Sequence, residues 1–131
     1  MPQKKISSED LIYKKYRPKA ESLLRERAQD LAEKYGFTYN RVSIKNTKTR
    51  WGSCSTKRNI NLHYKLIFVE DWYRDYVIIH ELCHLRQMNH SKLFWDEVEA
   101  IMPNYKKAAI YMRRKHPQHI SPPKKSMSAP E

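Results

Sequence analysis

The spacing of apolar residues predicts a long N-terminal helix over residues 8–35. Leucine and alanine side chains recur three or four positions apart along this segment, as in an amphipathic helix that packs on a core: Leu23, Leu24, Ala28, Leu31 and Ala32. Ser8 is placed to cap the start, and Gly36 follows as a C-terminal stop. Pro18 breaks the pattern and could divide the segment into two helices.

From residue 37 the pattern changes to an alternation of β-branched or aromatic residues with polar ones, which is typical of strands. Three strands are predicted, over residues 37–46, 49–56 and 58–66, with a turn at 56–58 between the last two. Gly52 is one of only two glycines in the chain. A glycine inside a strand indicates a bulge or the close approach of another part of the chain. The expected sheet is small and either antiparallel or mixed.

Helical periodicity returns at residue 70. Residues 70–90 are predicted as a long helix, residues 91–102 as a second one opened by Ser91, and residues 105–116 as a third. After Pro117 the chain contains three more prolines and no periodicity, so residues 117–131 are predicted to be a disordered basic tail. The expected architecture is α+β, with one domain over residues 1–116.

Composition limits the class of protein. A chain of 131 residues is long enough for one core, and its formal net charge of +12 favours either an anionic partner or simply a lysine-rich surface. Two cysteines make no disulfide framework, the N-terminus lacks an apolar leader, and no run is long enough to span a membrane. A cytoplasmic protein without a membrane partner is predicted. Its oligomeric state is left open.

The segment HELCHLRQMNH (residues 80–90) contains the candidate metal ligands and the candidate general base. His80 and His84 are four residues apart, so a helix places both imidazoles on one face within reach of one ion. Glu81 follows the first histidine and is suited to activate a water molecule as a general base. The His-Glu-x-x-His pattern is typical of zinc hydrolases. The alternative is a pair of surface histidines, but the apolar residues around them indicate a core helix.

A third histidine, His90, comes six residues after His84. A straight helix turns by about 1000° over ten residues, so His90 joins the others only if the helix ends before it. Asn89 tolerates the left-handed conformation that ends helices, and Ser91 can begin the next one. Metzincins have a similar spacing, with a glycine where this chain has Gln87. Three imidazoles suit catalytic zinc, and also nickel, cobalt or iron.

Three rival side chains for the third position are Glu97, Glu99 and His63. Carboxylates orienting the histidines are also expected, with Asp75 and Asp96 as candidates. His63, Tyr105 and Tyr111 are candidates for stabilising an oxyanion, although each has a simpler structural explanation. Cys83, between two of the histidines, is expected in the core.

Four stretches together resemble the YgjP-like metallopeptidase family, which looks related to the SprT and WLM zincins: TRWGSCS (49–55), INLHYKL (60–66), DYVIIHELCHLRQMNHSKLFW (75–95) and MPNYKKA (102–108). The resemblance implies a zincin-like fold, a zinc metallopeptidase activity, His80, His84 and His90 as metal ligands, and Glu81 as general base. The chain departs from the family's pattern at Arg58 and His63, and before the long helix, where the family has a proline. These departures concern substrate fit.

A peptide or an unfolded protein is the expected substrate, because zincins bind extended peptides along a strand beside the metal helix. The stretch RWGSCS is the candidate strand. Arg50 is a candidate for holding a carboxylate or another anion, and Trp51 is a second substrate-binding candidate, although a tryptophan here is more often core.

Two other functions remain open. The same site could serve a nucleotide phosphohydrolase of the nucleoside triphosphate pyrophosphatase type, with Arg50, Lys57, Arg58 and Arg86 as phosphate-holding candidates. Alternatively the protein is a basic nucleic-acid-binding module with YMRRKHPQHISPPKK as an arm, but no known nucleic-acid-binding motif is present.

Overall fold

The N-terminal segment forms one continuous helix, α1 (Ser8–Tyr35), in the computed structural model, which describes residues 6–123. Ser7 rather than Ser8 is the N-cap, and its Oγ accepts a hydrogen bond from the Asp10 backbone N–H at 3.0 Å. Gly36 ends the helix in the left-handed conformation, with φ of 76°, as predicted.

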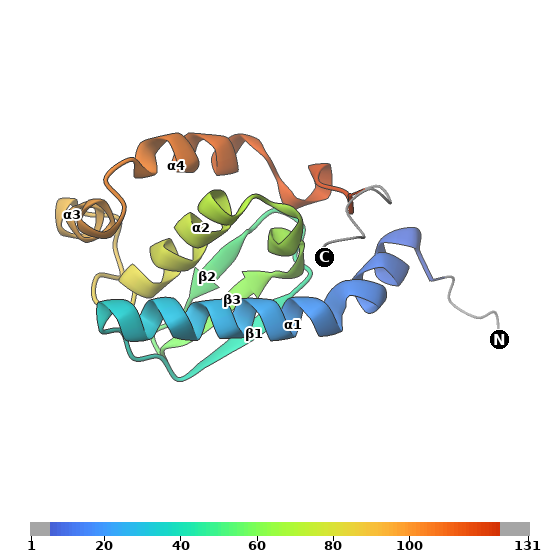
Figure 1. The fold of residues 1–131 in the computed structure, drawn as a ribbon, viewed down its shortest axis with the longest axis horizontal. Coiled ribbons are helices and arrows are strands. Elements are labelled where there is room, and N and C mark those ends of the chain that lie inside the picture. Colours follow the sequence, from blue (N-terminus) through green and yellow to red (C-terminus); the bar gives the residue numbers. More distant parts are fainter. Residues whose placement is uncertain (1–5, 124–131) are drawn as a thin grey trace.

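Pro18 lies inside α1 and does not divide it, so the two-helix alternative is wrong. The axis changes direction in the N-terminal part of the helix (Figure 1). Both sides of the proline are held by packing. Before it, Tyr16 meets Phe68 edge-on with ring centroids 4.9 Å apart, and after it Ala20 and Leu24 are fully buried. These contacts offset the hydrogen bond that proline removes.

The sheet is mixed and contains three short strands: β1 (Arg41–Lys45), β2 (Gly52–Cys54) and β3 (Asn59–His63). Their order is β1-β3-β2, so β2 lies at an edge; β1 runs parallel to β3, and β2 runs antiparallel to it. The predicted third strand is too long, because Tyr64–Phe68 form a 3-10 helix, η1. His63 Nδ1 accepts the Lys65 backbone N–H at 3.1 Å and so caps this turn.

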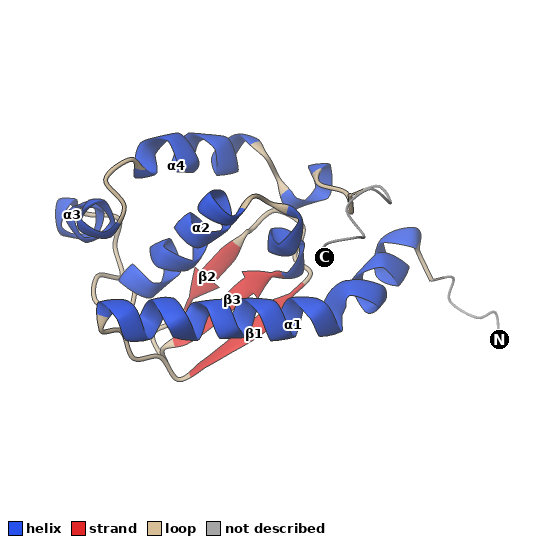
Figure 2. Ribbon diagram, in the orientation of Figure 1, coloured by secondary structure: helices blue, strands red, loops and turns tan. Residues whose placement is uncertain are grey.

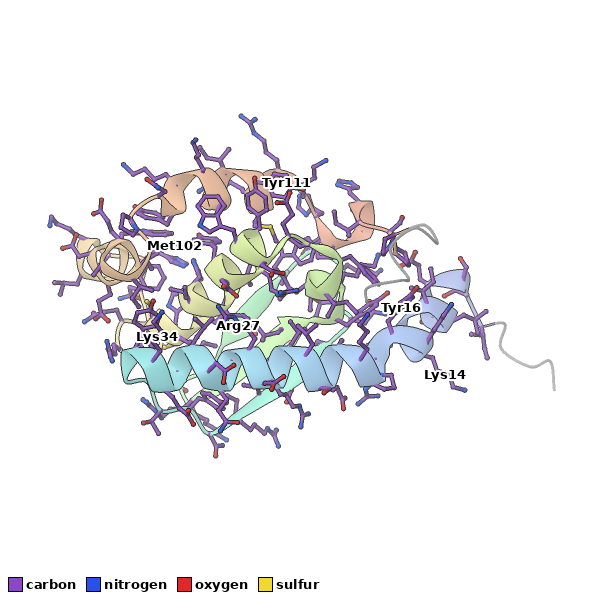
Figure 3. The ribbon with its side chains drawn as sticks, viewed as in Figure 1. Lys14, Tyr16, Arg27, Lys34, Met102 and Tyr111 are labelled. Atoms are coloured by element: carbon purple, nitrogen blue, oxygen red, sulfur yellow. The ribbon has the colours of Figure 1, made fainter. Side chains whose placement is uncertain are left out.

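Two helices cover the same face of the sheet. α1 packs over β1 and η1, and α2 (Asp71–Cys83) packs beside it over β2 and β3 (Figure 2). Arg27 of α1 reaches toward α2 (Figure 3) and donates two hydrogen bonds to the Asp75 carboxylate, at 2.9 and 2.7 Å. α3 (Lys92–Ile101) and α4 (Tyr105–Arg114) pack on the side of α2 away from α1. The central helix is therefore enclosed from several directions.

The helix that carries His80 ends earlier and by a different turn than predicted. After Cys83 the hydrogen bonds tighten to the 3-10 pattern, from Leu85 N–H to Leu82 O at 2.9 Å and from Arg86 N–H to Cys83 O at 3.0 Å. Asn89 is not left-handed, since among the described residues only Arg58 and Gly36 have positive φ. Ser91 is the N-cap of α3 as predicted, although its side chain makes no capping hydrogen bond.

The chain after α4 begins in an ordered form. Pro117–His119 form a second short 3-10 helix, η2, in place of the predicted disorder, and Pro117 is buried while its carbonyl accepts a hydrogen bond from Lys65 Nζ at 3.0 Å. Residues 124–131 of the predicted tail lie outside the described residues. Within residues 6–123, none of the helices has the length and apolar character needed to cross a membrane.

Candidate metal centre

The three predicted histidines come together at the C-terminal end of α2. His80 lies on the last turns of this helix, His84 caps it, and the chain returns through the following loop to bring His90 beside them. The Nε2 atom of His90 is 3.0 Å from Nε2 of His84 and 3.1 Å from Nε2 of His80. Among the described residues, no other group of three histidine, cysteine or acidic side chains converges in this way.

The spacing and the chemistry of these nitrogens fit a metal ion. Ligand nitrogens about 2.0–2.1 Å from a tetrahedral zinc are about 3.3 Å apart, close to the observed separations. The Nδ1 atom of His84 is 3.0 Å from the Gln87 carbonyl, which only accepts, so Nδ1 carries the hydrogen and Nε2 keeps a lone pair. Burial, followed by the neighbouring histidines, lowers the pKa of His80 to about 3. Neutral rings with converging lone pairs are what a divalent cation requires.

Aromatic side chains of α3 hold two of the imidazoles in place. Phe94 is fully buried and stacks on His84, with ring centroids 4.4 Å apart and an angle of 25° between the planes. Trp95 stacks on His90 at 5.7 Å and 23°. These two aromatic side chains form the wall that orients the candidate ligands.

Glu81 lies beside the histidines with only 6% of its surface exposed. Burial raises the pKa of its carboxyl to about 8, an effect that nearby Arg50 partly opposes. A Cβ atom added to Gly52 would lie 3.0 Å from the Glu81 Cγ and 3.0 Å from the Asn61 carbonyl oxygen. Gly52 is therefore at the close approach that the sequence indicated, and the contact partner is the candidate base.

The site opens on two cavities that share the residues around the histidines. The larger, about 450 Å³, extends between α2 and α4 and is lined by side chains that include Arg50, Trp51 and Arg113. The smaller, about 300 Å³, extends along β2 past Cys54 and Met88. His80, His90 and Glu81 line both. A substrate can therefore extend to either side of the candidate metal position.

Within residues 6–123, the backbone groups on the outer edge of β2, beside the site, have no hydrogen-bond partner. Trp51 and Ser55 exchange backbone hydrogen bonds with β3, since His63 N–H donates to Trp51 O and Ser55 N–H donates to Asn59 O, both at 2.9 Å. Hydrogen-bonded residues alternate along an antiparallel pair, so Gly52 and Cys54 direct their N–H and C=O groups away from β3. This edge can accept a further strand.

The rival third ligands lie elsewhere. His63 is buried, its Nε2–H donates to the Thr47 carbonyl at 2.8 Å, and burial lowers its pKa to about 4. Glu97 forms an ion pair with Arg86 at 3.1 Å, and Glu99 is exposed on α3. None of these three side chains joins the histidine cluster.

The groups that orient the histidines are not the predicted aspartates. Asp75 is bound to Arg27, and Asp96 forms an ion pair with Lys92 at 2.9 Å. The Tyr76 hydroxyl lies 3.3 Å from Nδ1 of His80 instead, in addition to the Gln87 carbonyl at His84. The position of Tyr76 four residues before His80 was a usable signal, because residues at this spacing meet on one helix face.

Two of the phosphate-holding candidates have structural partners. The Arg58 guanidinium donates to the carbonyls of Thr38 and Leu85, and Arg86 donates to those of Tyr35 and Gly36. Lys57 is exposed and lines none of the cavities around the histidines.

Arg50 and Trp51 both line the larger cavity, but they differ in exposure. Arg50 is exposed, whereas Trp51 is 9% exposed and its indole N–H donates to the Lys115 carbonyl, so Trp51 serves mainly as a wall of the cavity.

The oxyanion candidates Tyr105 and Tyr111 stack on Trp95 and Tyr73, respectively. Neither lines the cavities around the histidines. Cys83 is fully buried, as predicted.

Comparison with known proteins identifies the family. Residues 2–115 match the YgjP-like metallopeptidase domain. The chain belongs to this family. A comparison with curated proteins finds no match.

Two solved structures are similar to this member of the YgjP-like family. The metallopeptidase zymogen abylysin of Pyrococcus abyssi is 27% identical, with a TM-score of 0.59 over 66% of this chain and 89% of its own. The metallopeptidase zymogen jannalysin of Methanocaldococcus jannaschii is 18% identical, with a TM-score of 0.58 over 66% and 90%. At that identity the second likeness shows the fold alone. The α+β fold predicted from the sequence is confirmed.

Proposed function

We propose that this protein is a zinc-dependent metallopeptidase in which His80, His84 and His90 hold the metal and Glu81 is the general base. The observation that carries the proposal is the convergence of three imidazoles next to a buried carboxylate that faces open cavities. Membership of the YgjP-like metallopeptidase family and the likeness to abylysin support it. Nickel or another divalent transition metal would fit the same donors.

Each side chain has a role in the proposed reaction. When bound, zinc supplies Lewis-acid chemistry that lowers the pKa of a water molecule and polarises the scissile carbonyl. Glu81 receives the proton of that water and delivers it to the leaving amine. Burial raises the pKa of the Glu81 carboxyl to about 8, which makes its carboxylate a stronger proton acceptor than an ordinary glutamate, and Arg50 opposes part of this shift. Tyr76 and the Gln87 carbonyl fix the ring orientations of His80 and His84.

The edge of β2 is the proposed binding site for an extended peptide or an unfolded protein. The N–H and C=O groups of Gly52 and Cys54 would pair with the substrate backbone, as in β-strand addition. A peptide paired there would have a peptide bond beside Glu81, because a Cβ added to Gly52 would lie 3.0 Å from the Glu81 Cγ. The two unpaired cysteines, Cys54 and Cys83, fit the cytoplasmic location that we include in the proposal.

A nucleotide phosphohydrolase is the second candidate, because Arg50 lines the site and the chain is strongly basic. Less supports it than the peptidase, since Arg58 and Arg86 bind backbone carbonyls. A strand edge beside the site is also a feature that a peptide uses and a nucleotide does not.

The test compares the wild type with Glu81→Gln and with Glu99→Gln, a matched control at an exposed carboxylate on α3. Each zinc-loaded protein is assayed on an unfolded protein and on a panel of nucleoside triphosphates. We expect the wild type and Glu99→Gln to cleave the unfolded protein, and Glu81→Gln to lose about a hundredfold or more in rate while keeping its metal. Nucleotide turnover without peptide cleavage would replace the peptidase by the phosphohydrolase.

A further inference from the structure

Two arginines of separate elements flank the larger cavity. Arg50 precedes β2, and Arg113 lies in the last turn of α4, more than sixty positions later in the sequence. Both are exposed, and both line the cavity of about 450 Å³ that contains His80, His90 and Glu81. The fold thus brings two guanidinium groups to the site from opposite walls.

Neither arginine has a partner of its own among the residues that the structure describes. Four other arginines on or near the helices of the site do have partners. Arg27, Arg74 and Arg86 form ion pairs with carboxylates, and Arg58 donates hydrogen bonds to backbone carbonyls. Arg50 and Arg113 form no ion pair and no side-chain hydrogen bond within residues 6–123. Their donors remain available for a ligand in the cavity.

Both arginines share a cavity with the reacting groups. Arg50 lines both of the cavities that contain His80, His90 and Glu81. Arg113 lines the larger one together with Tyr76, whose hydroxyl lies 3.3 Å from Nδ1 of His80. A ligand held by both arginines would therefore lie in the cavity that contains Glu81.

The rest of the cavity restricts the kind of ligand. Apart from the candidate metal site, its walls are largely apolar, with contributions from Trp51, Val77, Trp95, Ala109 and Met112. Among the described residues that line it, Glu81 is the only acidic one. A guanidinium group in such surroundings binds a planar carboxylate through paired, charge-assisted hydrogen bonds. The adjacent strand edge selects a peptide as the bearer of that carboxylate.

We propose that Arg50 and Arg113 form a carboxylate-binding subsite that makes the protein prefer peptides with a carboxylate on a residue next to the scissile bond. This inference rests on the proposed peptidase function. The carboxylate has two sources with the same chemistry, the side chain of an aspartate or glutamate and the free C-terminus of the peptide. Arg113 is then a specificity-determining residue that no sequence motif marks.

The binding test uses zinc-loaded Glu81→Gln, which does not turn over its ligand. Short peptides with glutamate or glutamine at either position beside the intended scissile bond, each with a free or amidated C-terminus, are titrated calorimetrically. We expect one glutamate peptide or the free-acid series to bind at least about tenfold more tightly than its neutral twin. Adding Arg113→Gln should abolish that ratio, whereas Arg114→Gln, the next residue along the helix, should keep it. Arg113→Lys should retain part of it, because a point charge replaces the planar fork.

Cleavage by proteins with an intact Glu81 separates the two proposals. The ratio of kcat/KM between glutamate and glutamine peptides should fall toward one in Arg113→Gln and stay at the wild-type value in Arg114→Gln. Peptide cleavage with no preference for a carboxylate would overturn the subsite and leave the peptidase standing. Carboxylate-dependent binding without peptide cleavage would overturn the peptidase and leave the carboxylate-binding subsite standing. Inorganic triphosphate binding that depends on Arg113, without any peptide preference, would overturn the subsite as a peptide determinant.

Discussion

Replacing Gly52 by alanine is a sharp test of the contact between β2 and the candidate base. The new methyl group would lie 3.0 Å from the Asn61 carbonyl oxygen, 3.0 Å from Glu81 Cγ and 3.2 Å from Glu81 Oε2. Optimal separations between such atoms are about 3.5–4.0 Å, so the neighbours must move by about half an ångström. The Asn61 oxygen belongs to the paired strand β3, whereas the Glu81 side chain can rotate.

Two effects of different kind should result. Crowding in a packed region is expected to destabilise the fold by about 1–3 kcal/mol. Displacement of the Glu81 carboxylate by a fraction of an ångström to 1 Å should lower kcat/KM by about tenfold to a hundredfold, because proton transfer depends on its position. Zinc content should remain at the wild-type level, since the three atoms nearest to the methyl group belong to Asn61 and Glu81 and not to a histidine.

Gly36→Ala is the matched control, because Gly36 is the other glycine of the chain. Its φ of 76° makes alanine unfavourable by about 1–2 kcal/mol, while the added Cβ meets only Arg86 Nη2 at an ordinary 3.6 Å. Thermal unfolding, zinc content and peptide hydrolysis are measured for both variants. We expect Gly52→Ala and Gly36→Ala to lose similar amounts of stability, and turnover to fall only in Gly52→Ala. Wild-type kcat/KM in Gly52→Ala would refute the proposed position of the base.

Three further outcomes are expected. Burial lowers the pKa of His63 from 6.5 to about 4, so between these pH values the unfolded chain binds more protons than the folded one. The free energy of unfolding should therefore fall by up to about 3 kcal/mol as the pH falls through this range. Denaturation at pH 7 and 4.5 with the metal chelated should show a weaker pH dependence in His63→Gln than in the wild type, and an equal pH dependence would contradict this. Tyr76→Phe should weaken zinc binding about tenfold in a chelator competition, with Tyr111→Phe unchanged, and equal affinities would exclude the orienting role. Chelation should lower the free energy of unfolding by about 3–4 kcal/mol relative to protein with zinc at 100 to 1,000 times its Kd, and an unchanged Tm would argue against a folded-state metal site.

Local signals were sufficient where one residue decides the structure. Gly36 ends α1 because glycine alone adopts the left-handed conformation there without strain, and Gly52 marks a close approach because a side chain would meet Glu81. The i, i+4 histidines share a helix face in the structure as their spacing predicts. These features need no knowledge of the rest of the fold.

Features that depend on tertiary contacts could not be predicted from local sequence signals. Pro18 stays inside one helix because packing on both sides holds it, and α2 ends through tightened turns after Cys83 although Asn89 offered the stronger local signal. Arg86 has partners only because the tertiary fold brings both the end of α1, at the Tyr35 carbonyl, and Glu97 of α3 within its reach. Arg113 joins the site only because α4 folds back over α2, which periodicity alone does not predict.

The most direct measurement is the zinc content of the purified wild type, of His90→Ala and of Glu99→Ala, determined by elemental analysis after equal exposure to zinc and removal of excess. We expect about one zinc ion per chain in the wild type and in Glu99→Ala, and a large loss in His90→Ala, because the three Nε2 atoms converge on one position. Full zinc in His90→Ala, with loss in Glu99→Ala, would contradict the three-histidine site and place the third ligand on α3.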